Sequence, residues 1–105
     1  MIKEIDVLEL KAKLEKGEDF QFIDCREQEE WNDGHIEGAT LVPLSEFQER
    51  FEYMMPEKNK QIVLQCRSGK RSMNAAMFLL SKGYTDLINL EGGILAWTEA
   101  GFPVS

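Results

Sequence analysis

The sequence predicts an α/β fold in which five strands form a mostly parallel sheet with helices on both faces. Short apolar segments alternate with segments whose apolar residues recur at helical spacing, and turn residues separate the two kinds. Strands that are joined through helices run parallel, and the helices cover both faces of their sheet. The chain has 105 residues, of which 43% are hydrophobic, so we expect a single domain over residues 1–105.

The first half of the chain supplies three of the five expected strands. Ile2, Ile5 and Val7 indicate the first strand, and Asp6 is placed to cap a helix that ends at Gly17. The other expected elements of this half are a strand at 20–25, a short acidic helix at 27–31, a loop at 35–39, a strand at 40–42 and a helix at 44–51.

The second half supplies the other two strands. An apolar segment at 61–65 predicts a fully buried strand, and the helix that follows it is closed by Gly83. The face of this helix that we expect to be buried consists of Met73, Ala76, Met77 and Leu80. A fifth strand at 87–90 leads through a turn at 91–93 into a last helix, which carries Trp97.

The segment from Cys66 to Ser72 joins the buried strand to its helix, and we expect the functional site there. In such a turn several backbone N–H groups can converge on one point, which also faces the positive end of the helix dipole. Gly69 gives the backbone the freedom to turn its amides inward. A thiol held at this point should have a low pKa. This interpretation requires that the amides face the thiol and that the thiol is open to solvent.

Three cations, Arg67, Lys70 and Arg71, lie in this segment with no acid among them. Because the whole chain has a net charge of −7, the segment forms a positive island that suits the capture of a small anion. The alternative is a buried, inert cysteine that is followed by an ordinary cationic turn. Inert cysteines are rarely placed beside several cations at the start of a helix, which favours the functional interpretation.

The composition argues against several other classes of function. The acidic balance argues against nucleic acid as the main partner. No long apolar segment indicates a signal peptide or a membrane span, so we expect a cytoplasmic protein whose two cysteines are reduced. Two distant cysteines and one histidine provide no zinc-binding spacing, and no phosphate-binding or dinucleotide-binding motif is present. We therefore expect neither a metal nor a cofactor.

Four motifs give the chain a family resemblance. They are Ile23-Asp24-Cys25-Arg26 with Glu30-Trp31, Gly34 to Ala39, Cys66 to Ser72, and Leu90 to Gly93 with Trp97. In these motifs, which extend along nearly the whole chain, the sequence resembles the rhodanese family. The resemblance implies a single rhodanese domain with a five-stranded parallel sheet, in which Cys66 becomes a persulfide.

The resemblance also implies a sulfur-transfer reaction. The thiolate of Cys66 would take the outer sulfur of a small anionic donor such as thiosulfate and pass it to cyanide, a small thiol or a protein thiol. Main-chain amides of residues 67–71 would stabilise the charge on the sulfur, and the cations of the segment would orient the donor. The residues expected to bind the substrate are Arg67, Ser68, Gly69, Lys70 and Arg71.

Two other functions are compatible with this resemblance. Related phosphatases and arsenate reductases place five residues between their cysteine and an arginine, so that the loop surrounds a tetrahedral oxyanion. Here four residues separate Cys66 from Arg71, and Ser72 stands where a phosphatase has its arginine, which gives a tighter cradle that suits one sulfur atom. Other rhodanese-like domains are non-catalytic binding modules, but these commonly lack the cysteine that this chain retains.

Two further residues have chemistry that could suggest a role in the site. His35 lies in a glycine-rich turn, where we expect it to satisfy loop carbonyl groups rather than to act with Cys66. Cys25 could resolve a persulfide or form a disulfide with Cys66, but we interpret it as a small apolar residue that fills space at a strand end. The charged scaffold behind the site is expected to consist of Asp24, Arg26 and Glu30.

Overall fold

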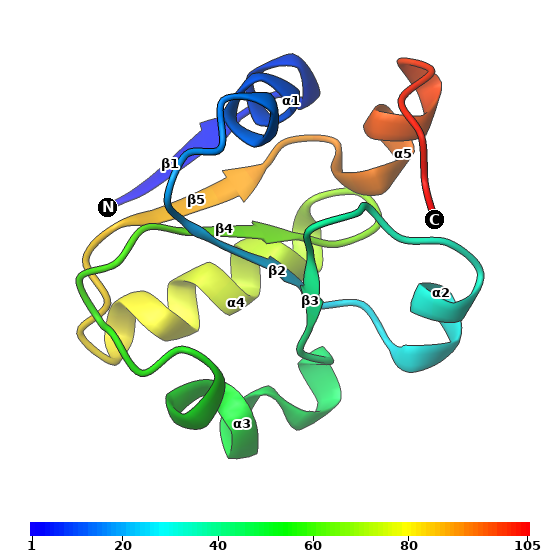
Figure 1. The fold of residues 1–105 in the computed structure, drawn as a ribbon. Coiled ribbons are helices and arrows are strands. Elements are labelled where there is room, and N and C mark those ends of the chain that lie inside the picture. The colour runs from blue at the N-terminus through cyan, green and yellow to red at the C-terminus, as the bar shows by residue number, and fades with distance from the viewer.

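All five strands of the computed structural model, which describes residues 1–105, run parallel in one sheet (Figure 1). The strands are β1 (Ile2–Ile5), β2 (Gln21–Asp24), β3 (Thr40–Leu41), β4 (Ile62–Gln65) and β5 (Leu87–Leu90). Their order across the sheet is β1-β5-β4-β2-β3, which places β4 at the centre. The predicted α/β class and the five-stranded parallel sheet are confirmed.

The helices cover both faces of this sheet. They are α1 (Val7–Glu15), α2 (Gln28–Asn32), α3 (Phe47–Met54), α4 (Lys70–Ser81) and α5 (Gly93–Glu99), and a 3₁₀ turn, η1 (Leu44–Glu46), precedes α3. Figure 1 shows α1 and α5 on one face and α3 and α4 on the other, while α2 lies beside the carboxyl end of β2. No helix is both long enough and apolar enough to pass through a membrane.

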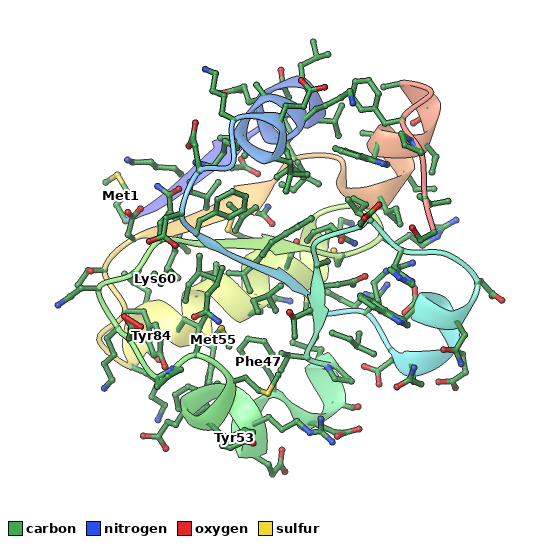
Figure 2. The ribbon with its side chains drawn as sticks, in the orientation of Figure 1. Met1, Phe47, Tyr53, Met55, Lys60 and Tyr84 are labelled. Atoms are coloured by element: carbon green, nitrogen blue, oxygen red, sulfur yellow. The ribbon has the colours of Figure 1, made fainter.

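Two hydrophobic clusters fill the space between the sheet and its helices. The larger one has 14 buried residues, lies on the α3 and α4 face, and includes both cysteines. Figure 2 shows Phe47, Met55 and Tyr84 on this side of the sheet. The smaller one has 9 buried residues, lies on the α1 and α5 face, and includes Leu10 and Trp97. The sheet is therefore buried on both faces, as its apolar strands require.

Helix α1 begins at the predicted cap. Asp6 accepts the N–H of Glu9 at 2.9 Å, and the Glu9 side chain accepts the N–H of Asp6 at 3.2 Å, which completes a capping box. The first strand ends at Ile5 and does not reach Val7, which is the first residue of the helix. The cap explains this difference, because it holds Asp6 at the helix start rather than in the strand.

The buried face of α4 differs from the predicted one. Of the residues expected there, Met77 is 56% exposed and Leu80 is 39% exposed. The buried residues of α4 are Ser72, Ala75, Ala76 and Leu79. Successive residues of an α-helix lie about 100° apart around its axis, so a buried face that is shifted by one residue points in a different direction. The small side chains of this face let α4 lie close to the sheet, whereas larger ones would hold it away.

Candidate active site

Cys66 is the first residue after β4, at the edge of the sheet where the strands end. The chain then turns through the exposed residues Arg67 and Ser68 to Gly69, which precedes α4. Gly69 has a φ angle of +108°, a conformation that other residues rarely adopt, and its N–H donates to Cys66 Sγ at 3.1 Å. The Gly69 amide therefore faces the sulfur, as the sequence predicts.

A second donor to the sulfur comes from Ser72, in the first turn of α4. Its hydroxyl oxygen lies 3.3 Å from Cys66 Sγ and also within hydrogen-bonding distance of Asn89 Oδ1. Asn89 in turn donates to the Glu4 carboxylate at 3.1 Å. Ser72 closes the predicted segment but is not among the residues expected to bind substrate, and Asn89 lies outside the predicted site. The signal that could have found them is a polar residue, Asn89, within the otherwise apolar strand β5.

These contacts lower the pKa of Cys66 to about 4. The largest cause is a hydrogen bond from the Cys25 thiol, and the hydrogen bonds from Ser72 and Gly69 add to it, while burial acts in the opposite direction. The pKa of Cys25 is raised, first because its thiol donates to Cys66 and then because it is buried. Cys66 is therefore the thiol that ionises, and its strongest support comes from a residue that the sequence analysis placed outside the site.

Cys25 directly follows β2, the strand next to β4, and lies beside Cys66. Strands β2 and β4 are in register up to the pair Asp24 and Gln65, and the N–H of Cys25 donates to the Gln65 carbonyl at 2.9 Å. The next residues along each strand, Cys25 and Cys66, are therefore neighbours, and they belong to the same hydrophobic cluster. The burial of Cys25 agrees with the predicted packing role. Its contact with Cys66 depends on strand order, which the sequence does not show.

The three cations of the segment have different surroundings. Arg67 and Lys70 are exposed and form no ion pair. Arg71 instead makes two hydrogen bonds of 2.8 Å to the carboxylate of Glu30 on α2, and these bonds are the first cause that lowers the pKa of Glu30 to about 2. The sequence analysis counted Arg71 among the cations of the positive island, but its charge is paired with an acid from another part of the chain.

The predicted charged scaffold divides into two ion pairs. Arg26 donates to Asp24 at 2.8 Å, and both residues are buried. Arg26 also donates to the backbone carbonyls of Gly34, at 2.8 Å, and Glu30, at 3.3 Å. The carboxylate of Glu30 is engaged separately by Arg71. Helix α2 is thus held to β2 through Arg26 and to α4 through Glu30.

The first turn of α5 supports the backbone of the segment. The N–H groups of Ile94 and Leu95 donate to the carbonyls of Cys66 and Arg67 at 2.9 and 3.1 Å. At Gly93, whose φ angle is +57°, an added Cβ atom would lie 2.4 Å from the carbonyl oxygen of Arg67. Only glycine permits this approach, so a residue far along the chain helps to shape the site.

The sulfur is not open to solvent, which is where the structure departs most from the sequence analysis. Cys66 is 1% exposed, and it lines none of the three surface hollows. The backbone of the segment is held by α5, whereas the side chains of Arg67 and Ser68 are exposed. A reactant therefore has no open path to the sulfur in this structure.

His35 is engaged within its own turn. Its Nδ1 atom lies 3.1 Å from the carbonyl oxygen of Trp31, and its ring stacks on that of Trp31 with centroids 3.7 Å apart. This agrees with the predicted role of satisfying a loop carbonyl. No group of three or more His, Cys, Asp or Glu side chains lies close enough together to hold a metal ion.

Comparisons with known proteins identify the family of the chain. A family model described as a rhodanese-like domain matches residues 6–100. The chain is 41% identical to the putative sulfurtransferase YtwF of Bacillus subtilis, over 91% of this chain and 90% of that protein. It is 36% identical to a sulfurtransferase of Allochromatium vinosum, over 99% of this chain and 95% of that protein.

A solved structure extends the likeness to the fold. The crystal structure of a rhodanese-related protein from Thermoplasma volcanium superposes with a TM-score of 0.84 and 30% identity, and the match covers 98% of this chain and 97% of that one. The chain therefore belongs to the family of rhodanese-like domains, and its relatives include proteins named sulfurtransferases.

Proposed function

We propose that the protein is a sulfurtransferase that carries sulfane sulfur as a persulfide on Cys66. The observation that carries this proposal is the environment of the sulfur, where the Gly69 amide donates at 3.1 Å and the Ser72 hydroxyl lies at 3.3 Å. With its pKa lowered to about 4, Cys66 is a thiolate at neutral pH. A thiolate is the nucleophile that sulfur transfer requires.

The proposed reaction has two displacement steps. The thiolate of Cys66 attacks the outer sulfur of a donor such as thiosulfate, the bond between the two donor sulfurs breaks, and sulfite leaves with the electron pair. An acceptor then attacks the terminal sulfur of the persulfide, and Cys66 leaves as a thiolate that the Gly69 and Ser72 donors stabilise. Because the protein itself carries the sulfur, the reaction uses no cofactor.

The substrate-binding segment of this proposal comprises Arg67, Ser68, Gly69, Lys70 and Arg71. Arg67 and Lys70 are the cations that attract the anionic donor, because both are exposed and unpaired. Arg71 contributes by position, since its pair with Glu30 holds the start of α4. Entry of the donor requires Arg67 and Ser68 to move away from the buried sulfur.

The acceptor in this proposal is cyanide, a small thiol or a cysteine of another protein. Exposed cations on an acidic chain of net charge −7 favour small anionic donors over nucleic acid or anionic membranes. Both cysteines are free, which suits a reducing compartment such as the cytoplasm.

Intact-mass measurement after incubation with thiosulfate tests the proposal. The wild-type chain should gain one sulfur atom after the donor is removed, and Cys66→Ser, with an unchanged circular dichroism spectrum, should gain none. The wild-type chain should then transfer that sulfur to cyanide as thiocyanate.

Other results would favour other functions. A folded wild-type chain that gains no sulfur would indicate a non-catalytic binding module, the alternative that the 1% exposure of Cys66 favours. Release of phosphate from an aryl phosphate would indicate a phosphatase. A gain of sulfur on Cys66→Ser would show that the carrier is another residue.

A further inference from the structure

Cys25 takes no covalent part in the transfer described above, yet it lies in the position of a disulfide partner. Strands β2 and β4 are paired in register up to the residues directly before the two cysteines. Neighbouring strands lie about 4.8 Å apart. A disulfide requires Cα atoms about 4.4–6.8 Å apart, with side chains on the same face. Cys25 and Cys66 directly follow a registered pair, share one hydrophobic cluster and are joined by a side-chain hydrogen bond, which is the placement that such a disulfide needs.

We propose that Cys25 is a resolving thiol for the persulfide on Cys66. When no acceptor arrives, Cys25 converts the persulfide into an internal disulfide and hydrosulfide is released. This inference rests on the proposed function and gives the same site a second outcome, the reductive release of sulfide.

The resolving step balances without an external oxidant. The Cys25 sulfur attacks Cys66 Sγ, a bond forms between the two cysteine sulfurs, and the bond between Cys66 Sγ and the terminal sulfur breaks. The terminal sulfur leaves with the electron pair and takes the proton of the Cys25 thiol, which gives hydrosulfide. The sulfane sulfur gains two electrons, and each cysteine sulfur loses one. A dithiol reductant then restores both thiols.

The state of Cys66 controls whether Cys25 can act. In the resting protein Cys25 is held protonated, because its thiol donates to the Cys66 thiolate and lies beside that negative charge. Formation of the persulfide moves the charge one sulfur farther away and removes this acceptor. Both of these causes of the raised pKa of Cys25 are then weakened, while burial still raises it, so loading of Cys66 favours reaction of the second thiol.

Burial favours the internal reaction over external ones. Cys25 is 0% exposed and Cys66 is 1% exposed, so thiols in solution have little access to either sulfur. Cys25 is already in place and needs no opening of the segment. An intramolecular partner with this geometry has a large advantage in effective concentration.

A time course of intact mass and released hydrosulfide tests this proposal on the full chain. Dilute wild-type protein is loaded with thiosulfate, freed of donor and held without an acceptor. We expect its mass to fall from one added sulfur to two hydrogens below the reduced chain, with one hydrosulfide released per chain. Peptide mapping should find Cys25 joined to Cys66. Under the same conditions, Cys25→Ser, which keeps a hydrogen-bond donor, should retain its persulfide at least about tenfold longer.

Two other results would contradict the resolving role of Cys25. Equal persistence of the persulfide in the wild-type and Cys25→Ser chains, or a disulfide between two chains, overturns the resolving role alone. Failure of both chains to load overturns the proposed function and this inference with it. Cys25→Ala serves if the serine variant does not fold, because it also lacks the second thiol and should also retain the persulfide.

Discussion

At the level of single residues, the hydroxyl of Ser72 has one proton and two neighbours that can accept it. Cys66 Sγ lies 3.3 Å from the hydroxyl oxygen, and Asn89 Oδ1 is the closer neighbour. When Cys66 is a thiol, the hydroxyl can donate to Asn89 and accept from the thiol. When Cys66 is a thiolate, the same proton stabilises the sulfur. Ser72 therefore couples ionisation of the cysteine to a contact with β5.

Ser72→Ala should raise the pKa of Cys66, because it removes one donor to the thiolate. A hydrogen bond to a charged group contributes about 1.5 kcal/mol, which corresponds to roughly a tenfold loss of thiolate at a pH near the midpoint. Thiolate absorbance in the ultraviolet should show a wild-type midpoint near pH 4 and a higher midpoint in the variant. Ser72→Thr retains the hydroxyl and should stay near wild type. An unchanged midpoint in Ser72→Ala would show that the other donors suffice.

At the level of secondary-structure elements, the site depends on parts that are distant in sequence. The first turn of α5 holds the backbone of the cysteine segment, because the N–H groups of Ile94 and Leu95 donate to its carbonyls. Helix α2 holds α4 through the pair of Glu30 and Arg71. The position of Cys66 therefore depends on α5 on one side and on the pair of α2 and α4 on the other.

Gly93→Ala should destabilise the protein more than Gly101→Ala does. Both glycines have positive φ angles, +57° and +83°, so both substitutions carry a backbone cost of about 1 kcal/mol. Only at Gly93 would the new Cβ atom also meet backbone, 2.4 Å from the Arg67 carbonyl oxygen, while nothing lies within 4 Å at Gly101. We expect an additional loss of about 2 kcal/mol, measured by urea unfolding. Equal losses of unfolding free energy in the two variants would mean that the backbone at Arg67 can shift to accommodate the added Cβ atom at little cost.

Glu30→Gln should remove a pH-dependent part of the stability. The hydrogen bonds from Arg71 are the first cause that lowers the folded-state pKa of Glu30 to about 2, from 4.5. Its contribution is therefore present above pH 4.5 and is lost as the pH falls towards 2. Both side chains are about one-third exposed, so solvent limits the contribution to about 1 kcal/mol. The free energies of unfolding of wild type and variant should differ at neutral pH and converge at low pH; a constant difference would exclude the ion pair as the cause.

Elements with strong local signals were predictable from the sequence. Asp6 marks a helix start, and the apolar segment before Cys66 identifies a fully buried strand. The buried face of α4 was not predictable in the same way. Its apolar residues offer more than one possible face, and contact with the sheet and with the Cys66 sulfur selects the one that contains Ser72.

At the level of the whole molecule, the sheet lies between two hydrophobic clusters and contributes side chains to each of them. Leu79 of α4 packs on one face and Leu10 of α1 on the other, and both are 0% exposed. The strands between them are four residues long or shorter. A sheet this short cannot remain ordered when it loses the helices on one face. The two clusters should therefore unfold together.

Leu79→Ala and Leu10→Ala should each lower the free energy of unfolding by about 2–5 kcal/mol. In both variants, tryptophan fluorescence and far-ultraviolet circular dichroism should report one shared urea transition. Trp97 lies on the face opposite Leu79, so in a Trp31→Phe background its fluorescence tests whether loss of packing on one face unfolds the other. Separate transitions for the two probes in Leu79→Ala would show that the clusters are independent.

Two of the contacts that were not predictable depend on the order of strands. Cys25 and Cys66 are far apart in sequence and become neighbours only because β2 lies next to β4. Ser72 and Asn89 meet because β5 lies on the other side of β4 and beneath α4. Sequence spacing locates the reactive cysteine, whereas its chemical surroundings come from the assembled sheet.

The sheet order also has a consequence for synthesis of the protein on the ribosome. Strand β1 pairs only with β5, so the first residues of the nascent chain have no partner until Leu90 has emerged. The backbone bonds from Ile94 and Leu95 form later still. Until then, the thiol of Cys66 is not yet buried as it is in the folded protein. The period just after translation is therefore when this cysteine is most open to indiscriminate oxidation.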